Sequence, residues 1–493
     1  MLEQLVLASI KSRTAVLIAL LALIAAGGYA AARLPIDAMP DVTTVQVSVL
    51  TRTGGLSAVE AEAAISIPIE NALNGVPGME EIRSMADAGV SSVTVIFREG
   101  TDPWFARQLV IERLRGIEKE LPPTASTPEL APLSTGLGEI YMFVVRSSHH
   151  SPMQLRTLLD WEILPKVRAV PGVTELNTMG GELKQFQVTI DRKRLSAHHV
   201  KLRDLVDALR AANQNAGGGY LDRGSESYVL RGDGLLKNER EIADVVLRTE
   251  PGHPPVLVRH VADVIVGPAL RYGAVTHGGK SEAVAGIVMM LLGANSRDVV
   301  IAVGQRVDEI RKTLPPGVEI DVIYDRADFV GRTLTTVVTN LAEGVAIVTI
   351  VLALFLGTMR GALAVVLGIP AAMAVAVIGM HAFGVTGDLM SLGAIDFGFL
   401  VDGPIVILEA ILAATIGKRL VGAARALEYG EVARLAVRPV AFAVAIIMLV
   451  YVPLLTLEGV EGKMFRPMAM TMALALFGAL LYSVVFFPAV LVT

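Results

Sequence analysis

The chain has 493 residues and a formal net charge of -5, from 43 basic and 48 acidic side chains. Hydrophobic residues make up 53% and charged residues only 18%, which excludes a disordered chain and a protein that coats nucleic acid. No cysteine is present, so disulfides, thiolate metal sites and cysteine nucleophiles are excluded. Any soft-metal chemistry must therefore come from Met, His, Asp or Glu.

The apolar residues are concentrated in six runs, each long enough to cross a bilayer. A helix needs about 20 apolar residues to cross about 30 Å of hydrocarbon, at about 1.5 Å per residue. The runs are residues 14–32, 337–357, 362–385, 389–416, 439–457 and 468–492. The sequence therefore predicts an α-helical membrane protein with six transmembrane helices. Residues 1–13 precede the first of them, and residues 337–493 hold the other five.

The first run also has features of a secretory signal. Lys11 and Arg13 precede it, and the alanines at 30–32 are typical of a signal-peptidase site. The apolar stretch is long for a signal core, however, and five further runs follow. We therefore expect an uncleaved anchor in preference to a cleaved signal.

Basic residues beside the short loops predict the orientation, since such residues stay on the cytoplasmic side. They lie before the first run, between the second and third, and between the fourth and fifth: Lys11, Arg13, Arg360, Lys418, Arg419, Arg425, Arg434 and Arg438. Residues 33–336 are then expected on the far side of the membrane.

This exported domain alternates predicted strands and helices. A first unit, residues 33–135, has the order strand, helix, hairpin, helix, at residues 44–51, 57–74, 82–84 with 91–97, and 102–121. The order recurs at residues 139–146, 151–170, 173–177 with 185–190, and 201–213, and closes with a strand, helix and strand at 282–292, 296–314 and 318–324. Residues 217–271, rich in Gly, interrupt the second unit. We predict an α+β domain of two ferredoxin-like βαββαβ repeats, the second formed by residues 136–216 and 272–336 around an inserted β-rich subdomain.

Three acidic residues lie within the fourth apolar run: Asp396, Asp402 and Glu409. An ionised carboxylate at mid-bilayer costs at least a few kcal/mol, so each needs a partner, a water-filled cavity or a proton. Asp402 and Glu409 are expected on one helix face, about 10 Å apart along the axis, with Asp396 about a third of a turn away. Pro404 lacks an N–H and frees the carbonyl of Leu400, which predicts a polar, bendable position beside Asp402.

This arrangement predicts a relay that passes protons or cations along the membrane normal. A carboxyl group in such a place can hold either a proton or a metal cation, so the two compete. The alternative is that the acids simply pair with Lys or Arg of neighbouring helices. Residues 337–357, 362–385 and 468–492 contain no Lys or Arg, which disfavours that alternative.

Within the fourth run, residues 396–409 read DFGFLVDGPIVILE. This segment resembles the fourth-helix signature of the heavy-metal-efflux branch of the resistance-nodulation-division (RND) transporters. The likeness is to its divalent-cation, cobalt-zinc-cadmium group. The stretches LPIDAMPDVTTVQVSVLT and ISIPIENALNGVPGMEEIRSMADAGVSSVTVIFREGTD, and the PGV...GG element at residues 171–181, are similar to the same family. Family members have two such halves, so we expect this chain to be the N-terminal half.

The resemblance implies a proton-driven antiporter, and not an enzyme, in the inner membrane of a Gram-negative bacterium. It implies a homotrimer whose periplasmic porter and docking subdomains join a periplasmic adaptor and an outer-membrane channel, with residues 217–271 as the docking insertion. The acids matching Asp396, Asp402 and Glu409 serve proton coupling and cation transport in this group. The implied substrate is a divalent metal ion, with no bound cofactor and the proton gradient as energy source. The copper and silver branch typically has a Met between its fourth-helix acids. None lies between Asp396 and Glu409, which favours zinc, cobalt, cadmium or nickel.

Three functions remain open at this point. The first is efflux of divalent metal cations, with the second half supplied by another chain or by a second copy. Export of organic amphiphiles by the same fold predicts an aromatic-lined cleft, whereas aromatic residues make up only 5% of the chain. The third is a truncated, non-transporting membrane scaffold. Nucleotide use is not supported, because the sequence has no GxxxxGK[ST] motif.

Overall fold

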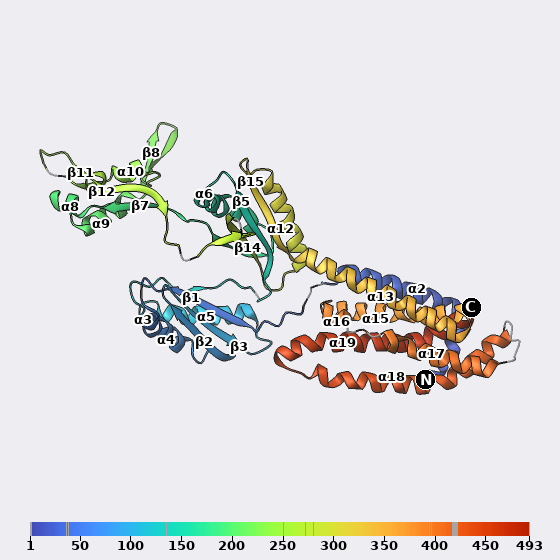
Figure 1. Ribbon diagram of the computed structural model, residues 1–493. Helices are drawn as coiled ribbons and strands as arrows, with labels where there is room; N and C mark the ends of the chain where they lie inside the picture. Colours follow the sequence, from blue (N-terminus) through green and yellow to red (C-terminus); the bar gives the residue numbers. More distant parts are fainter. Residues whose placement is uncertain are drawn as a thin grey trace.

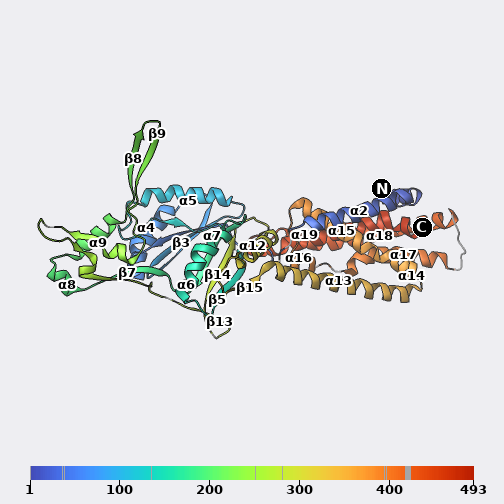
Figure 2. The same cartoon turned by 90° about the horizontal axis from the view of Figure 1, so that it is seen from above.

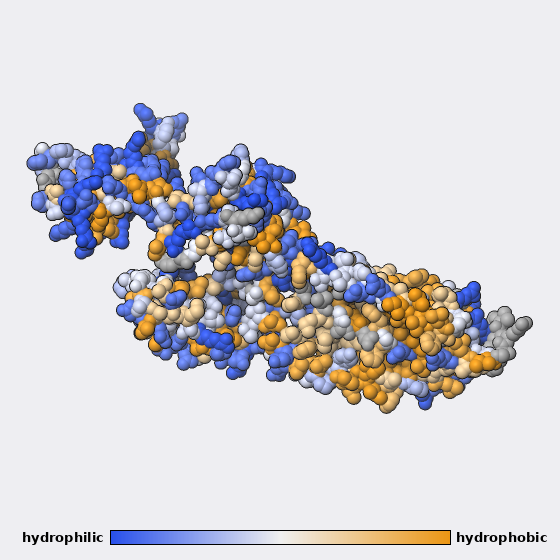
Figure 3. All heavy atoms as spheres, in the orientation of Figure 1, coloured by the Kyte–Doolittle hydropathy of each residue, from blue (hydrophilic) through white to orange (hydrophobic). Residues whose placement is uncertain are grey.

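The computed structural model describes all residues except 1, 36, 38, 135, 250, 272, 280, 394, 396, 417–422 and 493. It is elongated, with long helices gathered at one end and the sheet-containing units at the other (Figures 1 and 2). Both termini lie in the helical part (Figure 1). Figure 3 shows the same division as surface chemistry, since apolar side chains dominate the helical part and hydrophilic ones the sheet units.

Within the described residues, six helical segments are long and apolar enough to cross a membrane, as predicted. They run over Arg13–Arg33, Arg326–Phe355, Met359–Phe383, Met390–Thr415, Ala424–Leu455 and Gly459–Val492. The helices that form them are α2 (Arg13–Arg33), α13 (Arg326–Leu356), α14 (Met359–Val366), α15 (Gly368–Phe383), α16 (Leu389–Gly393), α17 (Phe397–Thr415), α18 (Ala423–Leu455), α19 (Gly459–Leu481) and α20 (Phe487–Val492). A π-helical segment, Tyr482–Phe486, joins α19 to α20, and a short helix, α1 (Leu2–Lys11), precedes α2.

Small residues bring the central helices of the bundle close together. α15 packs against both α2 and α19. A Cβ added at Gly27 of α2 would lie 2.5 Å from the Cβ of Ala374, and one added at Gly478 of α19 would lie 2.9 Å from the Cα of Ala372. Lipid gives helices no hydrophobic reason to associate, so close contact of this kind supplies much of their attraction.

The first sheet unit contains β1 (Gln46–Arg52), β2 (Met79–Asp87), β3 (Val90–Phe97) and β4 (Glu129–Leu130). They form an antiparallel sheet in the order β2-β3-β1-β4, which includes the predicted hairpin of β2 and β3. Its helices are α3 (Ala58–Ala61), continued through a π-helical segment into α4 (Ile67–Leu73), and α5 (Pro103–Ile117). The strands alternate buried and less buried side chains, so Val93, Val95 and Phe97 of β3 meet Val110 of α5 in one core.

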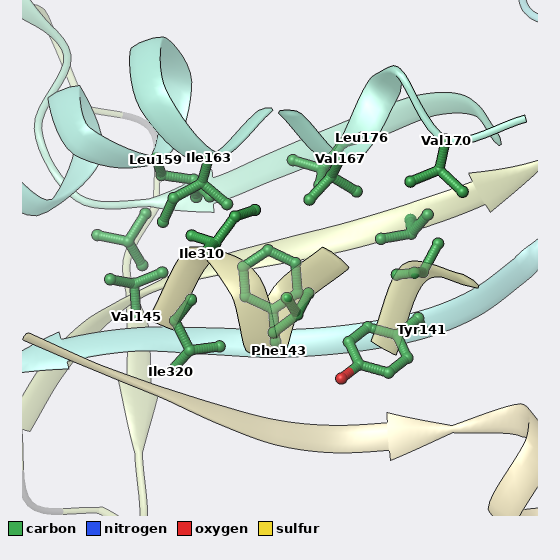
Figure 4. Close-up of a cluster of buried hydrophobic side chains, with 14 of the residues drawn as sticks. Tyr141, Phe143, Val145, Leu159, Ile163, Val167, Val170, Leu176, Ile310 and Ile320 are labelled. Atoms are coloured by element: carbon green, nitrogen blue, oxygen red, sulfur yellow. The ribbon is translucent and has the colours of Figure 1, made fainter. Parts of the chain in front are cut away.

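The second unit contains β5 (Glu139–Ser147), β6 (Val173–Gly180), β13 (Val275–His277), β14 (Ser281–Met290) and β15 (Val318–Asp325). β14 pairs with β5, β6 and β13, and β15 pairs with β5. The helices of this unit are α6 (Pro152–Leu158), α7 (Leu164–Arg168) and α12 (Ser296–Arg311). Figure 4 shows Phe143 and Val145 of β5 facing Leu159, Ile163 and Ile310 from the helices, all in one buried cluster.

The predicted hairpin of residues 173–177 with 185–190 is wrong. β7 (Lys184–Ile190) pairs with β12 (Ala262–Pro268) instead, and β6 pairs with β14. Gly180 and Gly181 both adopt positive φ, and a Cβ at Gly180 would come 2.7 Å from the carbonyl oxygen of Ala283. This left-handed turn, which glycine allows, takes the chain out of the second sheet.

β7 and β12 belong to a third unit with a core of its own. It includes α8 (Arg192–Ala197), α9 (Leu202–Ala212), α10 (Glu239–Ala243), α11 (Val258–Val261), β10 (Val246–Arg248), β11 (Val256–Leu257) and the hairpin of β8 (Ala216–Arg223) with β9 (Glu226–Gly232). Leu195, Leu205, Val258 and Val261 are buried at its centre. The unit lies at the end of the molecule farthest from the membrane helices (Figure 1).

Candidate functional site

α17 has one buried side and one exposed side. The buried residues are Leu400, Val401, Gly403, Pro404, Ile407, Leu408 and Ile411. Phe399, Asp402, Val406 and Glu409 are exposed and recur at spacings of three and four, which places them on one stripe of a helix. We call these four residues the acidic face of α17.

The structure places two of the three predicted acids on the acidic face. Asp402 and Glu409 are seven residues apart, or about 10 Å along the axis. Asp402 takes part in a hydrogen bond, ion pair or electrostatic interaction. The side chain of Glu409 makes no hydrogen bond or ion pair with another described residue. Asp396 lies outside the described residues.

The buried side of α17 is fixed by close packing. A Cβ added at Gly403 would lie 2.5 Å from Oγ of Ser483 and 3.2 Å from Cγ1 of Val440. α17 therefore packs closely against the π-helical segment Tyr482–Phe486 and against α18. Pro404 is buried beside Gly403 within α17, which continues from Phe397 to Thr415. This packing determines which side of the helix is left open, and the acids lie on that side.

Three basic side chains of α18 bind residues of α1 or α20. Arg434 and Arg438 of α18 bind Glu3 of α1, with N–O distances of 3.3 and 2.6 Å. Arg425 donates to the carbonyl of Leu491 at 3.1 Å. These contacts tie α1, α18 and α20 together at one end of the bundle.

A closed metal-binding cage is absent from the part of the chain that the structure describes. No three His, Asp or Glu side chains there form a group that could hold a metal ion. What α17 offers is a pair of carboxylates on an open helix face. Such oxygens can hold protons, or can serve as hard ligands to a cation that other groups help to coordinate.

Sequence reasoning missed an ion-paired junction between the bundle and the sheet units. Arg326, 5% exposed at the start of α13, donates from Nε and Nη2 to Oδ1 of Asp37 at 2.9 and 2.8 Å, and from Nη1 to the carbonyl of Leu137. Oγ of Ser296, at the start of α12, donates to Oδ2 of Asp37 at 3.2 Å. Asp37 and Arg326 are 289 positions apart, so no local pattern could pair them.

The comparisons with known proteins agree with this architecture. The chain is 42% identical to the cobalt-zinc-cadmium resistance protein CzcA of Cupriavidus metallidurans, over 99% of this chain and 47% of that protein. It is 34% identical to the cation efflux system protein CusA of Escherichia coli K12, over 99% of this chain and 48% of the relative. A crystal structure of a heavy metal efflux pump matches 98% of this chain and 48% of its own, with a TM-score of 0.90 and 34% identity.

The chain thus spans about half the length of the curated relatives it matches. The similarity runs through both the apolar helices and the sheet units, since the AcrB/AcrD/AcrF family is matched over residues 5–493. The chain is a membrane protein and belongs to the AcrB/AcrD/AcrF family.

Proposed function

We propose that the chain is the N-terminal half of a proton-driven exporter of divalent transition-metal cations, with Asp396, Asp402 and Glu409 as its proton and cation relay. The observation that carries the proposal is the acidic face of α17, which presents two carboxylates on a membrane-spanning helix. A carboxylate is costly in hydrocarbon, so its presence indicates a functional site. The 42% identity to a cobalt-zinc-cadmium resistance protein supports divalent cations as substrate.

We place residues 1–13 in the cytoplasm and residues 33–336 in the periplasm of a Gram-negative cell, with the bundle in the inner membrane. The predicted cytoplasmic basic residues support this orientation. Arg425, Arg434 and Arg438 bind α1 or α20, at one end of the bundle. The sheet units lie at the opposite end (Figure 1).

The two carboxylates fit the energetics of proton exchange. Moving a charge across 100 mV costs about 2.3 kcal/mol, so exporting a dication costs about 4.6 kcal/mol, and two entering protons return about the same amount. An exchange of two protons for one dication is therefore electrically neutral. The pH gradient then supplies the free energy for concentrating the metal outside. Neutral, protonated carboxyl groups also lower the cost of the unloaded site in the membrane.

The acidic face requires a partner. Asp402 and Glu409 are both exposed in this chain, and an exposed carboxylate in contact with lipid is energetically costly. We propose that a second half, from another chain or a second copy, covers it and completes the metal path. A homotrimer with a periplasmic adaptor and an outer-membrane channel is the assembly we propose for the complete pump.

We also infer that the first two sheet units are ferredoxin-like porter repeats and that the third is the docking insertion. Support comes from the order β2-β3-β1-β4 in the first sheet and the equivalent order β6-β14-β5-β15 in the second. The sequence placed the insertion at residues 217–271. The pairing of β7 with β12 favours an earlier start, near Leu183.

The proposal is tested by metal tolerance in a bacterial host that lacks its own metal exporters. The chain is expressed alone and together with the second half of the CzcA relative, each with the wild-type sequence, Asp402→Asn or Glu409→Gln. Val406→Ala, on the same face but without a carboxylate, is the matched control. We expect the wild-type and Val406→Ala pairs to raise tolerance to zinc, cobalt, cadmium or nickel, and both acid variants to behave like empty vector at equal protein levels.

Other outcomes would decide against the proposal. If organic dyes and detergents are tolerated while metals are not, amphiphile export is the better function. Growth identical to empty vector for the wild-type pair, with protein present in the membrane, would support the non-transporting scaffold.

A further inference from the structure

One buried acidic residue, Asp388, lies outside the predicted relay. Asp388 connects α15 to α16 and is 1% exposed. Its Oδ1 accepts from the backbone N–H of Ser391 at 2.6 Å, and its own N–H donates to Oγ of Ser391 at 3.0 Å. Its Oδ2 is buried and has no hydrogen-bond partner among the described residues. A buried oxygen without a partner is costly, and far more so when it carries charge.

The backbone beside Asp388 is joined to the linker that leaves α2. The N–H of Gly387 donates to the carbonyl of Pro35 at 2.9 Å, and the N–H of Asp37 donates to the carbonyl of Gly387 at 3.0 Å. Asp37 in turn binds Arg326 and Ser296, at the starts of α13 and α12. Asp388 therefore lies next to the junction through which the bundle meets the sheet units.

The charges around Asp388 do not compensate its carboxylate. Burial is the main cause that raises its pKa above the usual 3.8, the bonds from Ser391 oppose this rise, and the nearby carboxylate of Asp37 adds to it. α16 packs against α13 and α19. At this end α13 carries Arg326, already paired with Asp37, and Asp328 and Arg332, which pair with each other. The first turns of α19 carry Glu461, Lys463 and Arg466. Lys463 donates to the carbonyl of Thr43 at 2.6 Å and lies 3.5 Å from Glu99. Within the described residues Asp388 has no ion pair.

We propose that Asp388 is a proton-sensing positioning residue. When it is protonated, the α15–α16 connection stays bonded to Pro35 and Asp37; when it is ionised, repulsion from Asp37 and the cost of the unpartnered Oδ2 open this contact. Because α16 comes just before α17 in the chain, the switch links proton occupancy on the sheet side of the bundle to the position of Asp402. The inference rests on the proposed proton-driven function and adds a residue to it.

The direction of the pH effect follows from the raised pKa. The closed contact binds the proton more tightly than the open one, so its stability is fully present below the ordinary pKa of 3.8. That stability is lost as pH rises through the pKa of the closed form. Across this window the opening equilibrium rises by up to about tenfold per pH unit.

Hydrogen exchange of the backbone amides of residues 387–393, measured by mass spectrometry on the whole chain in lipid nanodiscs between about pH 4 and pH 8, tests the proposal. After correction for intrinsic exchange, we expect wild-type opening to increase with pH. Asp388→Asn retains a capping side chain and cannot ionise, so its exchange should stay low and independent of pH. Asp41→Asn is the matched control, because Asp41 is exposed in the same linker and caps the N–H of Thr43; it should behave like wild type.

Asp388→Ser, which also caps without a carboxylate, serves if the Asn variant does not fold. A wild-type chain with no pH dependence, or an uncharged variant that keeps the wild-type dependence, would overturn the proposal. The measurement uses no metal and no transport. A chain that shows the switch but confers no metal tolerance would therefore contradict the proposed function and leave this inference standing.

Discussion

Individual residues connect the parts of this molecule by close contact of small side chains and by ion pairs such as that of Asp37 with the buried Arg326. Gly27 lets α2 lie against Ala374 of α15 within the bundle. Arg326 and Asp37 join the bundle to the sheet units. The sequence shows neither contact, because apolar content predicts that a helix crosses the membrane and leaves open which helix it touches.

Gly27→Ala should destabilise the bundle. The added Cβ would lie 2.5 Å from that of Ala374, and relieving such overpacking typically costs about 1–3 kcal/mol. Gly28→Ala is the matched control, since nothing lies within 4 Å of its Cβ position. Thermal unfolding in detergent should show a lower Tm for Gly27→Ala and an unchanged one for Gly28→Ala. Equal Tm values for the two variants would contradict the close contact of α2 with α15.

Asp37→Asn should also destabilise the chain. It leaves the buried guanidinium of Arg326 without its counter-charge, a change that typically costs about 3–5 kcal/mol. Asp328→Asn breaks the exposed pair of Asp328 with Arg332, N–O distance 2.6 Å, and should cost only about 0–1 kcal/mol. Denaturant unfolding of both variants tests the difference, and comparable losses would show that the Asp37 pair is solvated.

At the scale of elements, the sequence predicts periodicity well and pairing poorly. The alternating pattern of residues 91–97 predicted β3, and the Asp102 cap belongs to a helix predicted at residues 102–121, because burial and capping are local properties. β7 was predicted as a strand, but its partner β12 lies some seventy residues later, beyond the reach of a pattern. The acidic stripe of α17 was predictable because helical spacing alone sets it, whereas its exposure depends on the packing of Gly403 and Pro404.

Leu205→Ala should unfold the third unit and spare the others. Leu205 is buried in a core separate from those of the two larger sheets, and Leu→Ala in a core costs about 2–5 kcal/mol. Leu202→Ala, on the same helix but 54% exposed, is the matched control and should change little. Hydrogen exchange should rise in residues 184–268 of Leu205→Ala alone. A rise that spreads into β1–β4 would mean that the units unfold together.

At the scale of the whole molecule, the membrane spans differ strongly in how much of each is buried. In the spans Met359–Phe383 and Gly459–Val492, 61% and 67% of the most apolar part is buried. In the spans Arg326–Phe355 and Ala424–Leu455, only 6% and 17% is buried. α17 lies between these extremes, with its acids on the open side. α17 is therefore one-sided, and its exposed side carries the proposed relay.

This one-sidedness can be measured by cysteine labelling, since the chain contains no cysteine of its own. Val406→Cys places a thiol on the acidic face, 46% exposed in the native residue, and Ile407→Cys places one on the buried side of the same helix turn. For the chain alone in detergent, a small maleimide should label Val406→Cys at least tenfold faster than Ile407→Cys, because a buried thiol reacts only when the helix opens. Co-expression with the second half of the CzcA relative should slow labelling of Val406→Cys toward that of Ile407→Cys. If labelling of Val406→Cys is unaffected by that half, while the two copurify, the acidic face is not the surface that the second half covers. The relay would then have to be completed from elsewhere.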